Sequence, residues 1–277
     1  AVLQKFTNVF SGVGQGSLLV LQPELLQALE LSKTTEDKLL LDDIRDLLGI
    51  HTLSAITQVP YNPSAIAHVG LQELFARQLT AGEDAVTTLM QKSPSRDAAV
   101  LTDPLTAAGA TLLRDLGTRQ VILTPSAQKS FDAPLDSAVA YLAKLPDGGS
   151  LSIYGTDPQY ARVMENGSLT PLERATRISA ELIVQREELS FVTSQAQQRQ
   201  VLLSSSTGEI LNVAVMRQLF RIINSSPVLA FTSQPVLAST PSSSQPITLR
   251  QGEDTSLEGL KATFEKLLPR ITNTSSM

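Results

Sequence analysis

The chain has no cysteine and no tryptophan among its 277 residues. Without cysteine, disulfide bonds and thiolate metal sites are excluded, although this absence fits a cytosolic and an exported protein equally well. Aromatic residues make up only 4% of the chain, which counts against a wide glycan groove lined with stacking rings. These absences exclude cysteine chemistry and count against aromatic stacking of sugars, but they do not indicate in which cellular compartment the protein works.

Basic stripes and long apolar runs are also missing. Lysine and arginine are scattered along a chain of net charge −5, so we expect no nucleic-acid binding. No apolar run reaches the roughly 18 residues of a membrane helix, so we expect no membrane insertion by this segment. The chain opens with Ala1 and shows no basic and apolar leader. We therefore expect it to be a piece of a longer protein.

What the sequence does contain is a regular alternation of elements. Hydrophobic residues make up 42% and charged residues 18%, which is typical of a folded domain with a sizeable core. Seven short apolar runs are each followed by a helix-like stretch, a pattern that predicts a parallel sheet covered by helices. The expected strands are Leu18–Leu21, Leu53–Val59, Ala98–Leu101, Val121–Leu123, Leu151–Tyr154, Val201–Leu203 and Val228–Phe231.

Seven strand–helix units fit a (β/α) barrel, and an open doubly wound sheet is the alternative. No linker divides residues 1–277, so we expect a single α/β domain. The clearest helix is Pro171–Leu189, preceded by a capping box of Thr170 and Glu173. Further expectations are a helix over Leu71–Gln91 interrupted near Gly82, helices over Ser137–Leu145 and Gly208–Asn224, a mobile loop at Ser239–Gln245 and a frayed tail at Thr272–Met277.

Ligands of such sheets meet the carboxyl ends of the strands, so the residues that follow each predicted strand are the candidate site. Asp103 and Asp157 both follow a strand and precede a proline. Paired carboxylates can act as general acid and base or hold a cation. Asp before Pro is equally typical of a turn and helix cap, so both interpretations stay open.

Amides and one aromatic residue occupy other predicted strand ends. Gln22 and Gln234 each precede a proline and could hydrogen-bond a ligand, although an amide cannot transfer protons. Tyr61 and Asn62 lie in a rigid loop between two prolines. Their side chains are candidates for contacting a ligand or, alternatively, for packing within the loop itself.

Other motifs lack the context that their chemistry needs. Gly12–Gly16 looks like a dinucleotide fingerprint but precedes a strand, so we expect no cofactor. His51 and His68 do not have the spacing of metal ligands, so we expect no metal. Ser204–Gly208 lacks the paired glycines of a nucleophile elbow, and we expect it to cap the following helix.

Several segments occur in an order similar to that of a known family. They are Leu18–Leu26, Val59–Pro63 followed by Ala67–Leu71, Leu105–Leu123, and Arg174–Leu189 followed by Gln200–Leu203. Together they span most of residues 17–235. Their order resembles a family of large actinobacterial envelope proteins of unestablished function, usually encoded beside the flippase for the peptidoglycan lipid precursor. The resemblance implies an exported, membrane-anchored parent protein and a barrel like those of polysaccharide deacetylases and some glycosidases.

The chain departs from that family where acids are expected. Gln22 stands in place of an aspartate, and Asn62 and Ser64 stand in place of acids around the proline–tyrosine loop. We therefore expect a non-catalytic extracytoplasmic domain that binds a cell-envelope protein or glycan and is linked to cell-wall assembly. The alternative is a carbohydrate-active hydrolase that uses Asp103 and Asp157 as its carboxylate pair.

Overall fold

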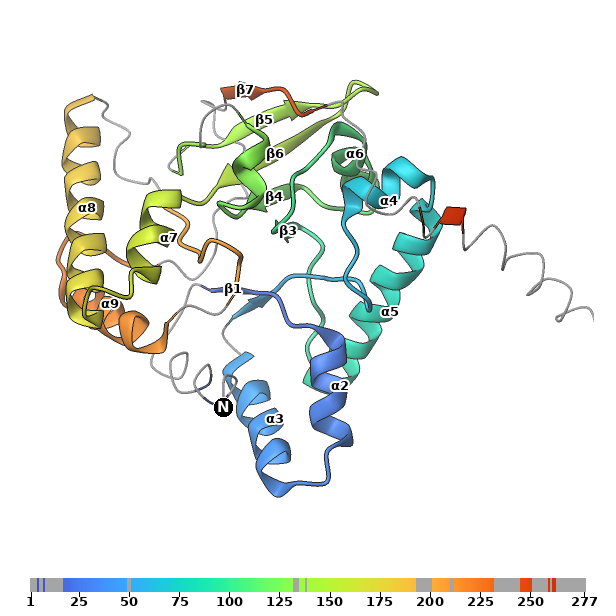
Figure 1. Ribbon diagram of the computed structural model, residues 1–277, viewed down its shortest axis with the longest axis horizontal. Coiled ribbons are helices and arrows are strands. Elements are labelled where there is room, and N and C mark those ends of the chain that lie inside the picture. Colours follow the sequence, from blue (N-terminus) through green and yellow to red (C-terminus); the bar gives the residue numbers. More distant parts are fainter. Residues whose placement is uncertain are drawn as a thin grey trace, which may run out of the picture.

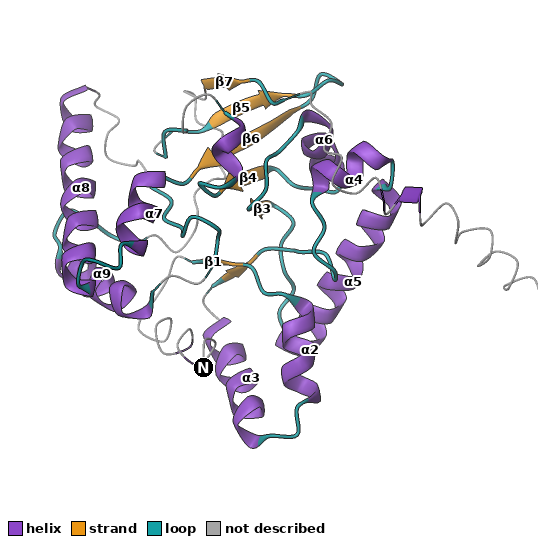
Figure 2. Ribbon diagram, viewed as in Figure 1, coloured by secondary structure: helices purple, strands orange, loops and turns teal. Residues whose placement is uncertain are grey.

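The computed structural model describes residues 17–48, 51–131, 135–137, 139–192, 201–209, 212–231 and 245–250, and the single residues 4, 7, 259, 261 and 262. In this part of the chain, helices lie on both sides of the strands and below them (Figures 1 and 2). The fold is α/β, as predicted. None of the described helices is both long and apolar enough to cross a membrane.

The described strands form one sheet of two strands and one of five, the latter in the order β3-β4-β6-β5-β7. The β1–β2, β3–β4, β4–β6 and β5–β7 pairs are parallel, and only β5 and β6 pair antiparallel. The strands are β1 (Leu18–Leu19), β2 (Thr52–Leu53), β3 (Ala98–Leu101), β4 (Gln120–Leu123), β5 (Tyr141–Lys144), β6 (Ser150–Gly155) and β7 (Gln245–Ile247).

A parallel bridge between Ser54 and Ser95 connects the two sheets. The Ser95 N–H donates to the Leu53 carbonyl at 2.8 Å, and the Ala55 N–H donates to the Ser95 carbonyl at 2.8 Å. The Ser54 hydroxyl donates to the carbonyl of Ala98 at 2.7 Å. Backbone hydrogen bonding is thereby continued from the end of β2 to the start of β3.

Most of the described helices begin after a residue whose side chain accepts an otherwise unpaired N–H group of the first turn, whereas the helices that begin at Pro23 and Gln72 have no such bond. Before α8, Thr170 and Glu173 exchange the hydrogen bonds of the predicted capping box, which is confirmed. The helices are α2 (Pro23–Leu31), α3 (Thr35–Leu48), α4 (Pro63–Val69), α5 (Gln72–Met90), α6 (Ala107–Asp115), α7 (Pro158–Glu165), α8 (Pro171–Val192) and α9 (Val213–Ser225), with a 3₁₀ turn at Ala127–Ser130.

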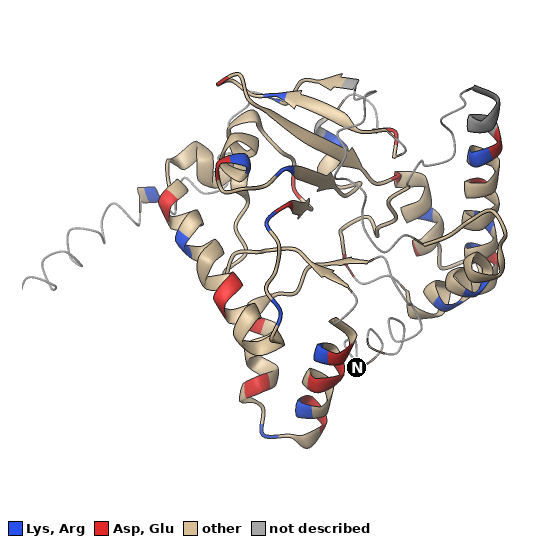
Figure 3. Ribbon diagram, turned by 180° about the vertical axis from the view of Figure 1, so that it is seen from behind, with Lys and Arg blue, Asp and Glu red and all other residues tan. Residues whose placement is uncertain are grey.

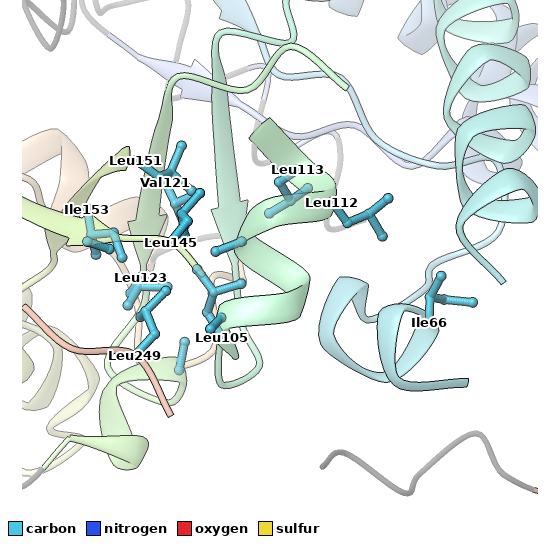
Figure 4. Close-up of a cluster of buried hydrophobic side chains, with 14 of the residues drawn as sticks. Ile66, Leu105, Leu112, Leu113, Val121, Leu123, Leu145, Leu151, Ile153 and Leu249 are labelled. Carbon is cyan, nitrogen blue, oxygen red and sulfur yellow. The ribbon is translucent and has the colours of Figure 1, made fainter. Parts of the chain in front are cut away.

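The outer face of the five-stranded sheet is covered by helices α4 and α6. Alternate strand residues point to this face, so Val121 and Leu123 of β4 lie beside Leu151 and Ile153 of β6 (Figure 4). The helices contribute further buried side chains, and Figure 4 shows those of Ile66, Leu112 and Leu113. Each fully buried aliphatic side chain contributes about 1.5–3 kcal/mol of transfer free energy, so this layer is a main source of stability.

The inner face of the sheet is also filled by apolar side chains. Val100, Ile122 and Tyr154 are aligned across β3, β4 and β6. Leu18 of β1 and Leu202 pack against the same cluster. Strands from both sheets therefore direct side chains toward one shared apolar interior. Two further clusters lie among α2, α3 and α5 and among α7, α8 and α9.

The predicted strands Val201–Leu203 and Val228–Phe231 are wrong, since neither run has strand structure. Val201 and Leu203 instead pack against the α7–α9 cluster, while Leu202 faces the sheet interior. Phe231 makes an edge-on contact with Phe220 of α9, with ring centroids 4.8 Å apart. Apolar side chains of these runs pack against the helices and, at Leu202, against the sheet, and the runs do not pair as strands.

The predicted helix Ser137–Leu145 is also wrong, because Tyr141–Lys144 forms β5. The Leu145 N–H donates to the Gly149 carbonyl at 2.9 Å, and Gly148 has a φ of +85°, so the chain turns tightly back into β6. This local hairpin overrides the helical pattern.

Helix α5 is not interrupted at Gly82, contrary to prediction. A Cβ at Gly82 would lie 2.1 Å from the Ile56 carbonyl oxygen, so the glycine allows close packing against this backbone. Most of Ser239–Gln245 and all of Thr272–Met277 lie outside the described residues, as does Gly12–Gly16, whereas Gln245 begins β7. The expectation of a single domain stays a prediction.

Candidate functional site at the strand ends

A threonine follows each of three parallel strands at its carboxyl end. Thr102, Thr124 and Thr156 come directly after β3, β4 and β6. The Thr124 N–H donates to the Leu101 carbonyl at 3.0 Å, and the Thr156 N–H donates to the Leu123 carbonyl at 3.0 Å. These threonines therefore continue the parallel pairing and lie at the edge of the sheet where α/β proteins bind ligands.

The side chain of Gln128 bridges the carboxyl ends of β4 and β6 through hydrogen bonds. Its Nε2 donates to the Leu123 carbonyl at 3.1 Å and to the Thr156 carbonyl at 2.6 Å. Its Oε1 accepts the N–H of Leu135 at 2.9 Å. A Cβ at Gly155 would lie 3.1 Å from this Oε1, so the glycine leaves room for the amide. The buried amide is thus fully engaged by backbone groups.

Residues 204–208 pack over the carboxyl ends of these strands. The Ser204 hydroxyl donates to Thr156 Oγ1 at 2.7 Å. The Ser126 N–H donates to the Ser206 carbonyl at 3.1 Å, and the Ser126 hydroxyl donates to the Thr102 carbonyl at 2.7 Å. We call this set the strand-end seal; its members are Thr102, Thr124, Ser126, Gln128, Thr156 and Ser204.

Gly208 ends the covering segment in a conformation that favours glycine, with a φ of +77°. A Cβ at this position would lie 3.0 Å from the Cγ2 of Thr102 and 3.3 Å from the Cγ2 of Thr124. On the outer side, Glu165 of α7 accepts both the N–H and the hydroxyl of Ser206 at 2.6 Å. The segment is therefore fixed against the strand ends and against α7.

The two candidate acids have different surroundings. Asp157 is half-buried and caps α7, and its Oδ1 accepts the Gln159 N–H at 2.7 Å. Asp103 is exposed in the turn between β3 and α6. Asp157 therefore acts as a helix cap, the structural role that its position before a proline suggested. A catalytic role together with Asp103 stays a prediction.

The other predicted ligand contacts lie at helix starts. Asn62 caps α4, with its Oδ1 accepting the Ser64 N–H at 2.8 Å, and Tyr61 beside it packs against the main core. Gln22 is exposed at the start of α2 and caps it only through its backbone carbonyl. Gln234 lies outside the described residues. Binding by these residues stays a prediction.

The seal is uncharged, since its members carry only hydroxyl and amide groups. The charged residues lie mostly on the helices (Figure 3). Behind the seal, burial raises the pKa of Tyr154 in β6. Among the described residues, no group of three His, Asp or Glu side chains could hold a metal ion.

Sequence reasoning missed the seal, although a signal was present. Leu-Thr-Asp-Pro, Leu-Thr-Pro-Ser and Gly-Thr-Asp-Pro each close an apolar run, so a threonine recurs at equivalent places. The prediction that Ser204–Gly208 caps the next helix is wrong. Helix α9 begins at Val213 and is capped by Asn212, whose Oδ1 accepts the Ala214 N–H at 3.0 Å.

Comparison with known proteins gives a likeness of structure only. No family model and no curated protein sequence matches the chain. The 4-alpha-glucanotransferase of Thermococcus litoralis superposes with a TM-score of 0.65 at 11% identity, covering 97% of this chain and 42% of that enzyme. The chain therefore spans less than half of the enzyme's length.

Two further enzymes have similar structures. The alpha-amylase AmyC of Thermotoga maritima matches with a TM-score of 0.57 at 10% identity, covering 99% of this chain and 74% of the amylase. A GH57 branching enzyme of Thermococcus kodakaraensis, solved with glucose, matches with a TM-score of 0.57 at 11% identity. This match covers 91% of the present chain and 67% of the branching enzyme. The α/β fold is thus similar to that of GH57-type enzymes, and fold alone assigns no activity.

Proposed function

We propose that the chain is a non-catalytic domain with a glycosidase-like fold that binds a glycan or protein of the cell envelope. The observation that carries the proposal is the strand-end seal. It occupies the edge of the sheet where catalytic groups of α/β enzymes are usually placed. The side chains of Thr124, Ser126, Gln128, Thr156 and Ser204 are hydrogen-bonded to each other or to the backbone, and Thr102 takes part through its carbonyl.

Glycoside hydrolysis usually requires two carboxyl groups about 5–9.5 Å apart, one on each side of the scissile bond. The seal contains no carboxylate, and its Thr124, Gln128 and Thr156 are buried. The carboxylate of Asp157 is engaged at the first turn of α7. A domain built in this way retains the scaffold of a carbohydrate-active enzyme and is suited to binding.

The proposal includes closure of the sheet as a (β/α) barrel similar to those of glycosidases and polysaccharide deacetylases. Leu18 of β1 and Leu202 support it, since both pack against the inner cluster of Ile122 and Tyr154. An open doubly wound sheet would instead carry helices on both faces.

The extracytoplasmic location, the membrane-anchored actinobacterial parent protein and the link to cell-wall assembly belong to the same proposal. Their support is the resemblance in segment order across residues 17–235.

A carbohydrate-active hydrolase using Asp103 and Asp157 is the second candidate. The favouring observation is the shared fold with a glucanotransferase, an amylase and a branching enzyme. Both aspartates follow parallel strands that are separated only by β4 in the sheet.

The two candidates are separated by measuring binding and turnover in parallel. The chain is incubated with insoluble peptidoglycan, insoluble α-glucan and envelope membranes, and both sedimentation and release of soluble sugar are measured. We expect co-sedimentation with at least one envelope fraction and no release above the background without protein.

Two matched variants identify the source of any activity. Sugar release that is lost in Asp103→Asn but retained in Asp97→Asn would establish the hydrolase, because Asp97 lies at the opposite end of β3. Failure to sediment with any envelope fraction would contradict the binding proposal.

A further inference from the structure

A cavity of about 380 Å³ lies beside the strand-end seal. Its described walls come from the end of α7, the start of α8, the covering segment and the residue that caps α9. The lining side chains are Met164, Glu165, Arg174, Ser205, Ser206, Thr207, Glu209 and Asn212. A volume of this size lies near the lower end of the range for small-molecule sites, about 300–1,000 Å³.

Arg174 is the buried charge of this cavity, with only 8% of its surface exposed. Its Nε donates to the Leu169 carbonyl at 2.9 Å, and its Nη1 donates to the Met164 carbonyl at 3.1 Å. Among the described residues no carboxylate forms an ion pair with it. A guanidinium has five N–H donors, so this one retains donors for a ligand while its plane is fixed by two carbonyls.

Acceptors on the opposite side are fixed as well. Glu165 is oriented by its two hydrogen bonds from Ser206. The Ser205 hydroxyl donates to the Glu209 carbonyl at 2.8 Å, which fixes the backbone that carries the Glu209 side chain. The cavity therefore presents donors and acceptors that are largely ordered before a ligand arrives, which lowers the entropic cost of binding.

The chemistry of the lining selects the class of ligand. Glu165 and Glu209 outnumber Arg174, so the formal charge of the described lining is negative and disfavours an anion. Met164 is the one apolar residue among the described lining residues, and the other seven carry hydroxyl, amide, carboxylate or guanidinium groups. A sugar hydroxyl both donates and accepts, and so it can pair with carboxylate, guanidinium and hydroxyl groups alike.

We propose that this cavity binds one or two rings of a neutral saccharide. The inference rests on the proposed function, because it assigns a place and a ligand class to envelope binding. The lining residues given above include no aromatic ring on which a sugar could stack. We therefore expect a dissociation constant on the order of 1 mM for an isolated disaccharide.

The test is a titration of the full 277-residue chain followed by nitrogen-15 NMR. The probes are maltose and N,N′-diacetylchitobiose, with glucose 6-phosphate as the charged comparison. Amide shifts are expected at residues 205–207, 209 and 212 with at least one neutral disaccharide. Tighter binding of glucose 6-phosphate than of either neutral disaccharide, or no shift at these residues with either disaccharide, would overturn the inference.

Variants locate the site. Glu209→Gln and Arg174→Gln should each weaken disaccharide binding about tenfold, whereas Arg177→Gln, on the exposed part of the same helix, should not change it. Arg174→Gln removes a buried group, so its folding is checked by circular dichroism. Thr207→Trp fills the cavity from an exposed position and should abolish binding without loss of fold. Unchanged binding in Glu209→Gln and Thr207→Trp would contradict the site.

The two proposals fail in different ways. If Thr207→Trp still sediments with the envelope fraction and the titration shows no cavity shifts, the saccharide site is wrong and envelope binding stands. If disaccharides bind the cavity but the chain sediments with no envelope fraction, the envelope partner is wrong and the saccharide site stands.

Discussion

Both the strand-end seal and the neighbouring cavity carry serine and threonine hydroxyls, yet their polar groups are used differently. In the seal, Thr156 and Gln128 are buried, and their side chains donate to backbone carbonyls. In the cavity, Thr207 and Glu209 are exposed, and Arg174 retains donors. Burial, hydrogen-bond partners and the charged side chains of the cavity together separate a structural polar cluster from a candidate binding site.

The largest effect is expected from Gln128→Leu. The Thr156 carbonyl and the Leu135 N–H would lose their buried partner, whereas the Leu123 carbonyl would keep the Thr156 N–H, and each unpaired buried group costs about 1–3 kcal/mol. We expect a loss of about 3 kcal/mol or more in the free energy of unfolding, measured by urea denaturation. Gln159→Leu, whose side chain is exposed on α7, is the control and should change it by less than about 0.5 kcal/mol. Equal losses in both variants would show that the seal is not a distinct structural unit.

Gly208→Ala should have the next largest effect. The left-handed backbone alone costs a residue with a Cβ about 1 kcal/mol, and contact with Thr102 and Thr124 should raise the loss to about 2 kcal/mol. Gly148→Ala is a matched control, since its φ is +85° and a Cβ there would meet nothing within 4 Å. Its loss should stay near 1 kcal/mol by the same denaturation assay. A larger loss in Gly148→Ala would contradict the packing of residue 208 on the strand ends.

Lowering the pH should destabilise the protein through His51 and not through the seal. Burial, with a smaller contribution from Lys92, lowers the pKa of His51 below its ordinary value near 6.5. The unfolded state then binds more protons than the folded state, so stability decreases as the pH falls below about 6.5. Because a single proton is taken up, the free energy of unfolding can change by at most about 1.4 kcal/mol per pH unit. Urea denaturation between pH 7.5 and 5.5 should show this slope, and His51→Gln should remove it; a slope that persists in the variant would point to another group.

The smallest effect is expected from Tyr160→Phe. The ring is buried among α7, α8 and α9, and its hydroxyl has no hydrogen-bond partner among the described residues. Because no bond is lost, the free energy of unfolding should change by less than about 0.5 kcal/mol or increase slightly. Thr156→Val is the contrast in the seal, where lost hydrogen bonds should cost about 1–3 kcal/mol. Thermal melting of both variants measures the difference, and a larger loss in Tyr160→Phe would contradict the contrast.

Local patterns predicted the part of the fold in which local and tertiary signals agree. The strands β3, β4 and β6, and the capping box before α8, were evident because each apolar run or cap is complete within a few residues. The strand predicted at Val201–Leu203 was wrong because a segment packed between a sheet and helices is as continuously apolar as a buried strand. The helix predicted at Ser137–Leu145 was wrong because residues 141–144 pair with β6, and the turn that follows them sets this pairing.

The candidate site was predictable in position but not in composition. The carboxyl ends of β3 and β6 were the expected place, and both aspartates do follow them. The cover by residues 204–208 depends on contacts such as Ser204 with Thr156, which lie 48 residues apart in the sequence. Pairing at that separation leaves no periodic signal in the chain. The cavity around Arg174 has the same origin, since its walls come from three separate stretches of the chain.

The most direct test is a crystal structure of the chain grown with maltose at a concentration well above 1 mM. We predict sugar in the cavity against Arg174 and Glu209, with Thr124 and Thr156 still covered by residues 204–208. Sugar bound over those threonines, with Asp103 and Asp157 on either side of its glycosidic bond, would contradict this prediction and establish the strand ends as an active site.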